Sequence, residues 1–300
     1  MNRELATKIA NAVLYEGYML YPYLPSAIKN RQRWSFGILY PPAYHEVGLG
    51  TERAQMHSEC LVQVTGNPVL HLQLRFLQLV GCEGGEEGSE RSFDCELSIG
   101  RVAQHSFPFV FAGDSVAGTQ REITGTISVA TAKLNDDVVK LTTEVTNTSS
   151  LASDPHDRDA ALFSSLFSTL TILGITGGEF VSLLVPPEDL REAVAQCKNV
   201  GNFPVLVGAE GERDMMLCSP IVLYDYPQIA PESAGDFFDG TEMDEMLTLR
   251  VMTLTDDEKS QMRMGDNHVR NLLQRTEANA REQLMRTHGT IRSLRPVNEP

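Results

Sequence analysis

Residues 69–80 read VLHLQLRFLQLV, and this stretch decides the fold class. Every second residue from Leu70 to Phe76 is apolar, which is the period of a β-strand with one buried face. From Leu77 to Leu79 the apolar positions change parity, which predicts a β-bulge or a strand buried on both faces. A turn cluster at residues 65–68, TGNP, separates this expected strand from an earlier one.

The same alternation recurs further along the chain. Apolar residues alternate over 93–99, 123–129 and 141–145, and the polar run at 135–137 predicts a hairpin between the last two. No clear helical period interrupts these strands between residues 58 and 148. The pattern therefore predicts a β-sandwich or a strongly curved antiparallel sheet.

Helical periods lie mostly outside this region. They cover residues 4–20, 159–173, 256–264, 266–275 and 277–288. Residues 180–224 mix short strand and helix patterns. The predicted class is α+β: a central antiparallel β-sandwich or curved sheet with an N-terminal helix, a mixed α/β second half and C-terminal helices. We expect two domains, 1–150 and 151–300, or one interlocked domain.

Composition narrows the class of protein. The 25 Lys and Arg against 40 Asp and Glu give a net charge of −15, so we expect no nucleic-acid partner. No run of about 18 apolar residues occurs, which predicts no transmembrane segment. The five cysteines lack C-x-x-C spacing, which favours a reducing compartment over a zinc or iron–sulfur site. We expect an acidic cytoplasmic protein without a cofactor; a homo-oligomer stays open.

Aromatic and basic residues gather in one segment near the N-terminus. Six of the eight tyrosines and the only tryptophan lie within residues 15–44. Tyr, Trp and Arg are favoured in binding hot spots, and Arg binds carboxylate or phosphate with two prongs. The candidate partner- or anion-binding residues are Tyr15, Glu16, Tyr18, Tyr21, Tyr23, Lys29, Asn30, Arg31, Arg33 and Trp34. The alternative is that the segment packs against the protein's own acidic body, with its tyrosines in the core.

No catalytic motif is recognisable, and no catalytic or metal-binding residue is assigned. The sequence lacks G-x-S-x-G, the P-loop, G-x-G-x-x-G and H-E-x-x-H. His156, Asp157 and Asp159 follow Asp154 closely, which is compatible with a metal site or a His–Asp acid/base pair. The same composition is typical of helix caps and turns, which is the more common use of such residues.

Six motifs together resemble a bacterial protein family. They are YEGYMLYPY (15–23), KNRQRWSFG (29–37), GGEFVSLL-x-PPE (177–188), CKNVGNFPVLVG (197–208), SPI-x-LYDYPQIAPES (219–233) and DEMLTLRVMTLTDDEK (244–259). This uncharacterised family is encoded beside actinobacterial-type [NiFe] hydrogenase genes and has no assigned chemistry. The resemblance implies an accessory or assembly role, with a hydrogenase subunit or maturation factor as the partner. The alternatives are a metal-assisted hydrolase-like enzyme using His156, Asp157 and Asp159, or a structural subunit retained in the mature hydrogenase complex.

Overall fold

The computed structural model describes residues 2–24, 27, 30, 36–48, 52–82, 85–99, 102–114, 120–151, 154–229, 235, 237–238 and 244–287. The chain forms two compact units. Unit 1 consists of Met1–Glu16 and Trp34–Gln228, and unit 2 of Gly17–Arg33 and Ile229–Pro300. Residue 150 lies inside unit 1, where β6 (Phe167–Phe180) pairs with the earlier strand β1 (Gln55–Cys82). The expected domains, 1–150 and 151–300 or one interlocked domain, stay a prediction.

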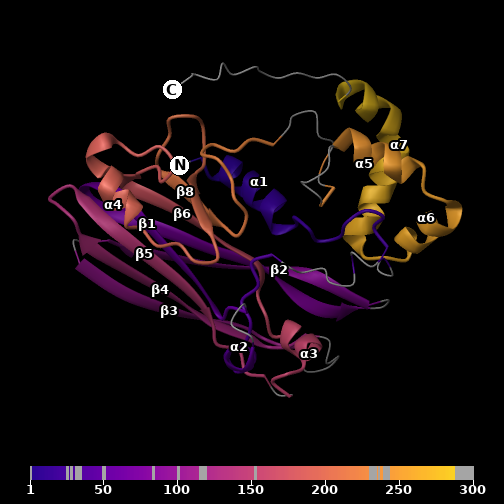
Figure 1. Ribbon diagram of the computed structural model, residues 1–300, viewed down its shortest axis with the longest axis horizontal. Helices are drawn as coiled ribbons and strands as arrows, with labels where there is room; N and C mark the ends of the chain where they lie inside the picture. Colours follow the sequence, from indigo (N-terminus) through magenta and orange to yellow (C-terminus); the bar gives the residue numbers. More distant parts are fainter. Residues whose placement is uncertain are drawn as a thin grey trace. The chain divides into compact units, whose positions relative to one another are not determined.

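A single antiparallel sheet of eight strands dominates the described part of unit 1. The remaining strands are β2 (Gly85–Ser98), β3 (Val102–Phe111), β4 (Ile123–Lys133), β5 (Val138–Asn147), β7 (Phe203–Leu206) and β8 (Met215–Ser219). Their order is β3-β4-β5-β1-β6-β8-β7, with β2 paired to β1, and Figure 1 shows most of them in this sequence from the lower edge upward. Together with helices at both ends of the chain, the sheet confirms the α+β prediction.

Strand β1 is the axis of the sheet. Its first part pairs with β5 and its second part with β2, while β6 follows its other edge. The register with β6 shifts between Arg75 and Leu77, so the bulge expected from the parity change is confirmed. The turn expected at residues 65–68 is wrong, because β1 continues through it with a second register shift between Val64 and Val69.

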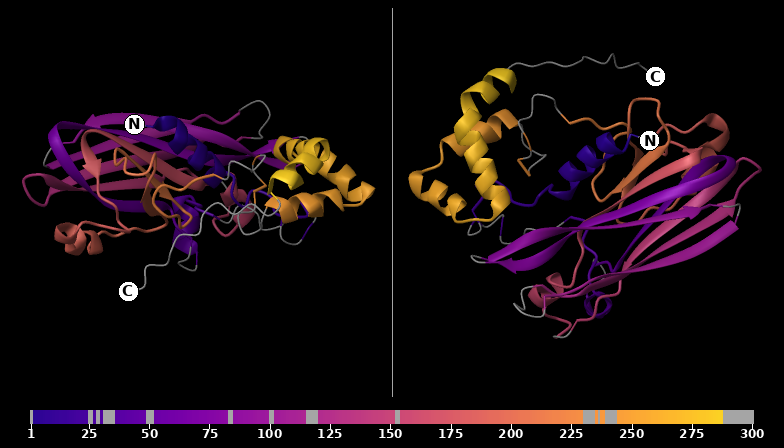
Figure 2. Two further views of the ribbon diagram at one scale, coloured as in Figure 1. Left: turned by 90° about the horizontal axis from the view of Figure 1, so that it is seen from above. Right: turned by 180° about the vertical axis from the view of Figure 1, so that it is seen from behind.

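Alternation along the strands gives the sheet two distinct faces. The inner face carries Leu70, Leu72 and Leu74 of β1, which are at most 1% exposed. Phe76 on this face lies 6.3 Å from Phe109 of β3, measured between ring centroids. A flat sheet would separate β1 from β3 by three strand spacings, roughly 14 Å. The sheet is therefore strongly curved around this aromatic cluster, and Figure 2 shows the long strands twisting.

Glycine makes room for the curvature at one point. The Phe109 ring lies directly over Gly125 of β4, where an added Cβ would overlap the ring. Both residues are described on strands that pair with one another, with Phe109 opposite Gly125 in register. A side chain at position 125 would have to displace the ring from the core.

The helix α1 (Arg3–Leu14) covers the outer face of the sheet, where it contacts β6, β8 and β1. Its apolar stripe, Ala6, Ile9, Ala10, Val13 and Leu14, is buried. Arg75 on the outer face donates to Glu90 of β2 and to Asn11 of α1 at 2.6 Å. The helix is shorter than expected, because Gly17 turns the chain with φ of 69° and the following residues belong to unit 2.

The helix expected over residues 159–173 is wrong. Only α3 (Arg158–Leu162) is helical, and β6 begins five residues later. Phe167 to Ile175 are all buried, because β6 lies between β1 and β8 with both faces covered. A strand buried on both faces is a continuous apolar run that periodicity does not separate from a helix. The other short elements of unit 1 are α2 (Pro42–Val47), η2 (Glu188–Leu190) and α4 (Arg191–Ala195).

Unit 2 is a small helical assembly. Its helices are α5 (Asp244–Met252), α6 (Asp256–Arg263) and α7 (Asn267–Thr287). Helix α6 begins with a capping box between Thr255 and Glu258, and α7 packs against both α5 and α6 (Figure 1). The two separate helices expected over 266–288 are one helix. Within the described residues, no helix is both long and apolar enough to cross a bilayer.

Candidate functional site

The expected binding segment is divided between the two units. Tyr15 and Glu16 follow α1 in unit 1, whereas Tyr18, Tyr21, Tyr23 and Asn30 belong to unit 2. The remaining residues of the prediction lie outside the described residues: Lys29, Arg31, Arg33 and Trp34. The ten residues are therefore divided among unit 1, unit 2 and positions outside the described residues.

Three of these residues are part of the core of unit 2. Tyr18, Tyr23 and Asn30 are at most 3% exposed. The Tyr18 hydroxyl donates to Asp266 Oδ2 at 3.0 Å, and the Tyr23 hydroxyl donates to the carbonyl of Phe237 at 3.0 Å. Asn30 bonds to the backbone of Leu20 and Leu24. Their burial agrees with the alternative that the tyrosines belong to the protein's own core, and a role of these three residues in partner binding stays a prediction.

Two other tyrosines of the segment are partly exposed. Burial raises the pKa of the Tyr15 hydroxyl, and the charge of Glu90 adds to this effect while Arg75 opposes it. In unit 2, the Arg250 guanidinium lies over the Tyr21 ring, 5.4 Å from its centroid, in a cation–π contact. A role of Tyr15, Glu16 and Tyr21 in partner binding stays a prediction.

The polar residues near position 156 form a turn and a helix cap. Asp157 accepts a hydrogen bond from the backbone N–H of Ala160 and caps α3. Asp154 Oδ1 accepts from the backbone N–H of His156 and lies 3.0 Å from its Nδ1. Among the described residues, no group of three His, Cys, Asp or Glu side chains could hold a metal ion.

Three of the quoted motifs meet at the Asp225 carboxylate. Ser182 belongs to the motif at 177–188, and its hydroxyl donates a hydrogen bond to Asp225 Oδ2 at 2.6 Å. The backbone N–H of Leu206 in β7 donates to Asp225 Oδ1 at 2.8 Å. The Ser182 hydroxyl also accepts from the backbone N–H groups of Leu184 and Val185. Asp225 therefore ties the loop after β6 and the loop after β8 to the edge strand β7.

The two tied loops expose apolar side chains. Leu183 and Tyr226 pack against the core, but their neighbours point outward. The exposed fractions are 51% for Leu184, 79% for Val185, 68% for Val222 and 86% for Tyr224. We call these four residues the Asp225 surface. Exposed apolar residues on loops that are anchored by hydrogen bonds are typical of interaction sites.

The backbone at this place is strained. Tyr226 has a φ of 56°, in the left-handed region that is unfavourable for a large side chain. Its N–H donates to the carbonyl of Leu206 at 2.8 Å, which holds the conformation. Strain of this kind costs about 1–3 kcal/mol and is concentrated at functional sites.

Sequence reasoning missed the Asp225 surface, although its residues lie within the quoted motifs. Tyr224 and Tyr226 are the two tyrosines outside the aromatic N-terminal segment. The tie itself joins Ser182 to a residue 43 positions later, which no local pattern indicates.

Comparison with known proteins adds no relative. No protein-family model matches the chain, and a search of curated proteins finds none with significant sequence similarity. The resemblance to the hydrogenase-associated family is therefore carried by the quoted motifs alone.

Proposed function

We propose that the protein is a binding and assembly factor that docks a partner on the Asp225 surface. The observation that carries this proposal is the convergence of three of the quoted motifs on the Asp225 carboxylate, which holds two loops that carry four exposed apolar residues. Protein partners are held by buried aromatic and aliphatic anchors, and an ordered loop loses little entropy on binding.

The partner that the resemblance favours is a [NiFe] hydrogenase subunit or maturation factor. The Asp225 surface fits an apolar segment of such a protein, and the acidic side chains Glu188, Asp189 and Glu192 follow the first loop directly. An apolar segment flanked by basic residues would complement both features. The protein would hold this segment while the hydrogenase is assembled, without making or breaking bonds.

The test is purification of the tagged chain from its native host, with identification of the proteins that accompany it. We expect a hydrogenase subunit or maturation factor at near-stoichiometric yield. The double variant that carries both Tyr224→Ala and Val185→Ala should bind the purified partner about 30-fold more weakly, which is the effect of losing about 2 kcal/mol at a hot spot. Val110→Ala is the matched control, because Val110 is 63% exposed on β3, away from the tied loops.

The outcomes separate the alternatives. Weaker binding by the double variant but not by the control Val110→Ala supports the proposal. Equal binding by both variants refutes the surface, and the absence of hydrogenase proteins refutes the partner. Co-purification with the mature, active hydrogenase rather than with its precursor would favour the structural-subunit alternative.

A further inference from the structure

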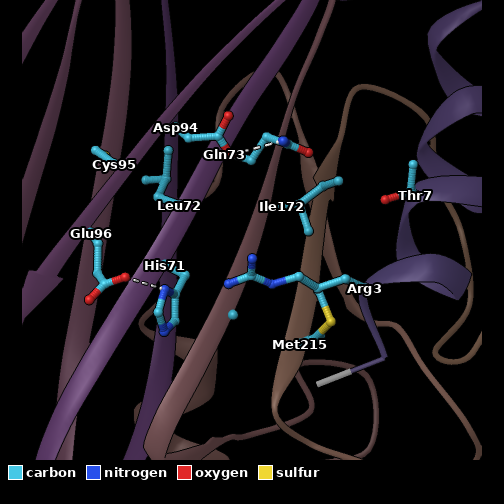
Figure 3. A pocket seen from close by; sticks show the side chains of 11 residues that line it. Arg3, Thr7, His71, Leu72, Gln73, Asp94, Cys95, Glu96, Ile172 and Met215 are labelled. Atoms are coloured by element: carbon cyan, nitrogen blue, oxygen red, sulfur yellow. Dashed lines mark hydrogen bonds and ion pairs between the residues drawn. The ribbon is translucent and has the colours of Figure 1, made fainter.

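A cavity of about 300 Å³ lies on the outer face of the sheet, under the first turn of α1. Figure 3 shows its floor, which is formed by two rows of side chains from neighbouring strands. One row runs from Glu96 of β2 through His71 of β1 to Gly174 and Met215; the next runs from Asp94 through Gln73 to Ile172. Arg3 and Thr7 of α1 lie over this floor. Small-molecule sites in proteins begin at about this volume.

The side of the cavity formed by β1 and β2 carries two carboxylates, Asp94 and Glu96. His71 Nδ1 lies 2.9 Å from Glu96 Oε2, and His71 Nε2 lies 3.2 Å from the Thr176 hydroxyl. Because a carboxylate only accepts, Nδ1 carries a hydrogen and donates it to Glu96. Both ring nitrogens of His71 have a partner, Glu96 on Nδ1 and Thr176 on Nε2, so His71 positions Glu96.

Asp94 is fixed in the same way. Gln73 Nε2 donates to Asp94 Oδ1 at 2.9 Å, and Figure 3 shows the Gln73 carbonyl turned away from Asp94 toward Ile172. Within the described residues, the second oxygen of each carboxylate, Asp94 and Glu96, has no hydrogen-bond donor. The two carboxylates stand two positions apart on one face of β2, where like charges repel. A cationic group between them would relieve this repulsion.

Arg3 supplies the opposite charge. Figure 3 shows its guanidinium extending over the floor toward His71, across the cavity from Asp94. Arg3 forms no ion pair with any of the described residues, and its planar fork matches a carboxylate. A ligand with a cation alone would leave Arg3 unmatched, and a phosphate dianion would be repelled by two carboxylates.

We propose that this cavity binds a small zwitterion of the α-amino acid class. Its ammonium group lies between Asp94 and Glu96, its carboxylate on Arg3, and its side chain over the apolar floor of Ile172 and Met215. The site is distinct from the Asp225 surface, because none of its lining residues lies on the two tied loops.

The test is thermal unfolding and calorimetric titration of the full chain with each common L-amino acid in turn, at up to about 10 mM. We expect at least one to bind with a Kd below about 1 mM and to raise Tm. Its amine and carboxylic-acid analogues, each lacking one charge, should bind at least about tenfold more weakly. Two variants should weaken binding by a similar factor: Arg3→Gln, and Asp94→Asn, which keeps an oxygen for Gln73.

The controls are Arg213→Gln and Asp137→Asn, which remove the same charges from exposed loops. They should bind as the unaltered chain does. The proposal is overturned if no amino acid binds, if the site variants bind as well as the controls, or if either single-charge analogue binds as tightly as the amino acid. Binding of Mg²⁺ or Ca²⁺ that Asp94→Asn abolishes, without amino-acid binding, would equally overturn it.

Discussion

Replacement of Asp225 by Asn tests whether a carboxylate, and not only its shape, holds the two loops. Both carboxylate oxygens accept: Oδ2 from the Ser182 hydroxyl and Oδ1 from the N–H of Leu206. The Ser182 oxygen already accepts from Leu184 and Val185, so its hydroxyl can only donate toward residue 225. An amide offers one acceptor and one donor, so either orientation of the new side chain in Asp225→Asn sets a donor against a donor.

The expected cost follows from this geometry. One hydrogen bond to a charged acceptor contributes about 1.5–3 kcal/mol, so the loops should open about 10 to 150 times more often. Because the loops are tied to an edge strand, we expect their opening to be local. The global free energy of unfolding should therefore fall by less than the free energy of this local opening. Partner binding should weaken in proportion if the ordered loops form the docking surface.

Amide hydrogen exchange measures this opening directly. The N–H groups of Leu184, Val185 and Leu206 should exchange about 10 to 150 times faster in Asp225→Asn, while those of the central strand β1 keep their rates. Asp137→Asn is the matched control, because Asp137 is exposed in the turn before β5. Unchanged exchange at Leu206 in the Asp225 variant would show that the carboxylate does not tie the loop to β7.

Two further substitutions test the sheet. Gly125→Ala places a methyl group against the Phe109 ring and should lower the free energy of unfolding by about 1–3 kcal/mol in urea titrations; no change would contradict the close packing. Burial alone would raise the pKa of Glu59, but the Lys198 N–H and the Lys140 ammonium outweigh it and lower that pKa below its ordinary 4.5. The stability that Glu59 contributes is therefore present above pH 4.5 and lost as the pH falls through the lowered pKa. The free energies of unfolding of the unaltered chain and of Glu59→Gln should therefore converge as the pH is lowered. A difference that stays constant with pH would refute this.

The sequence predicted those strands that have one buried face. It did not predict the strand whose two faces are both buried. Strands β4 and β5 alternate buried and half-buried residues along their length, and both were expected from the sequence. Strand β6 lies between two neighbours with α1 on its outer face, so alternation is absent and the spacing of Phe163, Phe167 and Leu170 imitated a helix.

The aromatic N-terminal segment shows a different limit. Its tyrosines and arginines are the residue types of a binding site, but composition does not distinguish a hot spot from a core. Tyr18 and Tyr23 are buried because their hydroxyls find Asp266 and the Phe237 carbonyl, more than 200 positions away. Such partners are determined by tertiary structure and leave no local pattern in the sequence.

The two proposed sites are formed by different residues, although both lie next to β6 and β8. Leu206 and Met216 belong to the inner core against which Tyr226 packs, whereas Met215 and Ile172 point to the outer face and line the cavity under α1. Substitutions at Arg3 or Asp94 therefore leave the Asp225 tie intact, and substitutions at Tyr224 leave the cavity intact. If an Arg3 variant that still folds lost both amino-acid binding and partner binding, the two sites would have to be coupled through β6 and β8. Their independence would then be refuted.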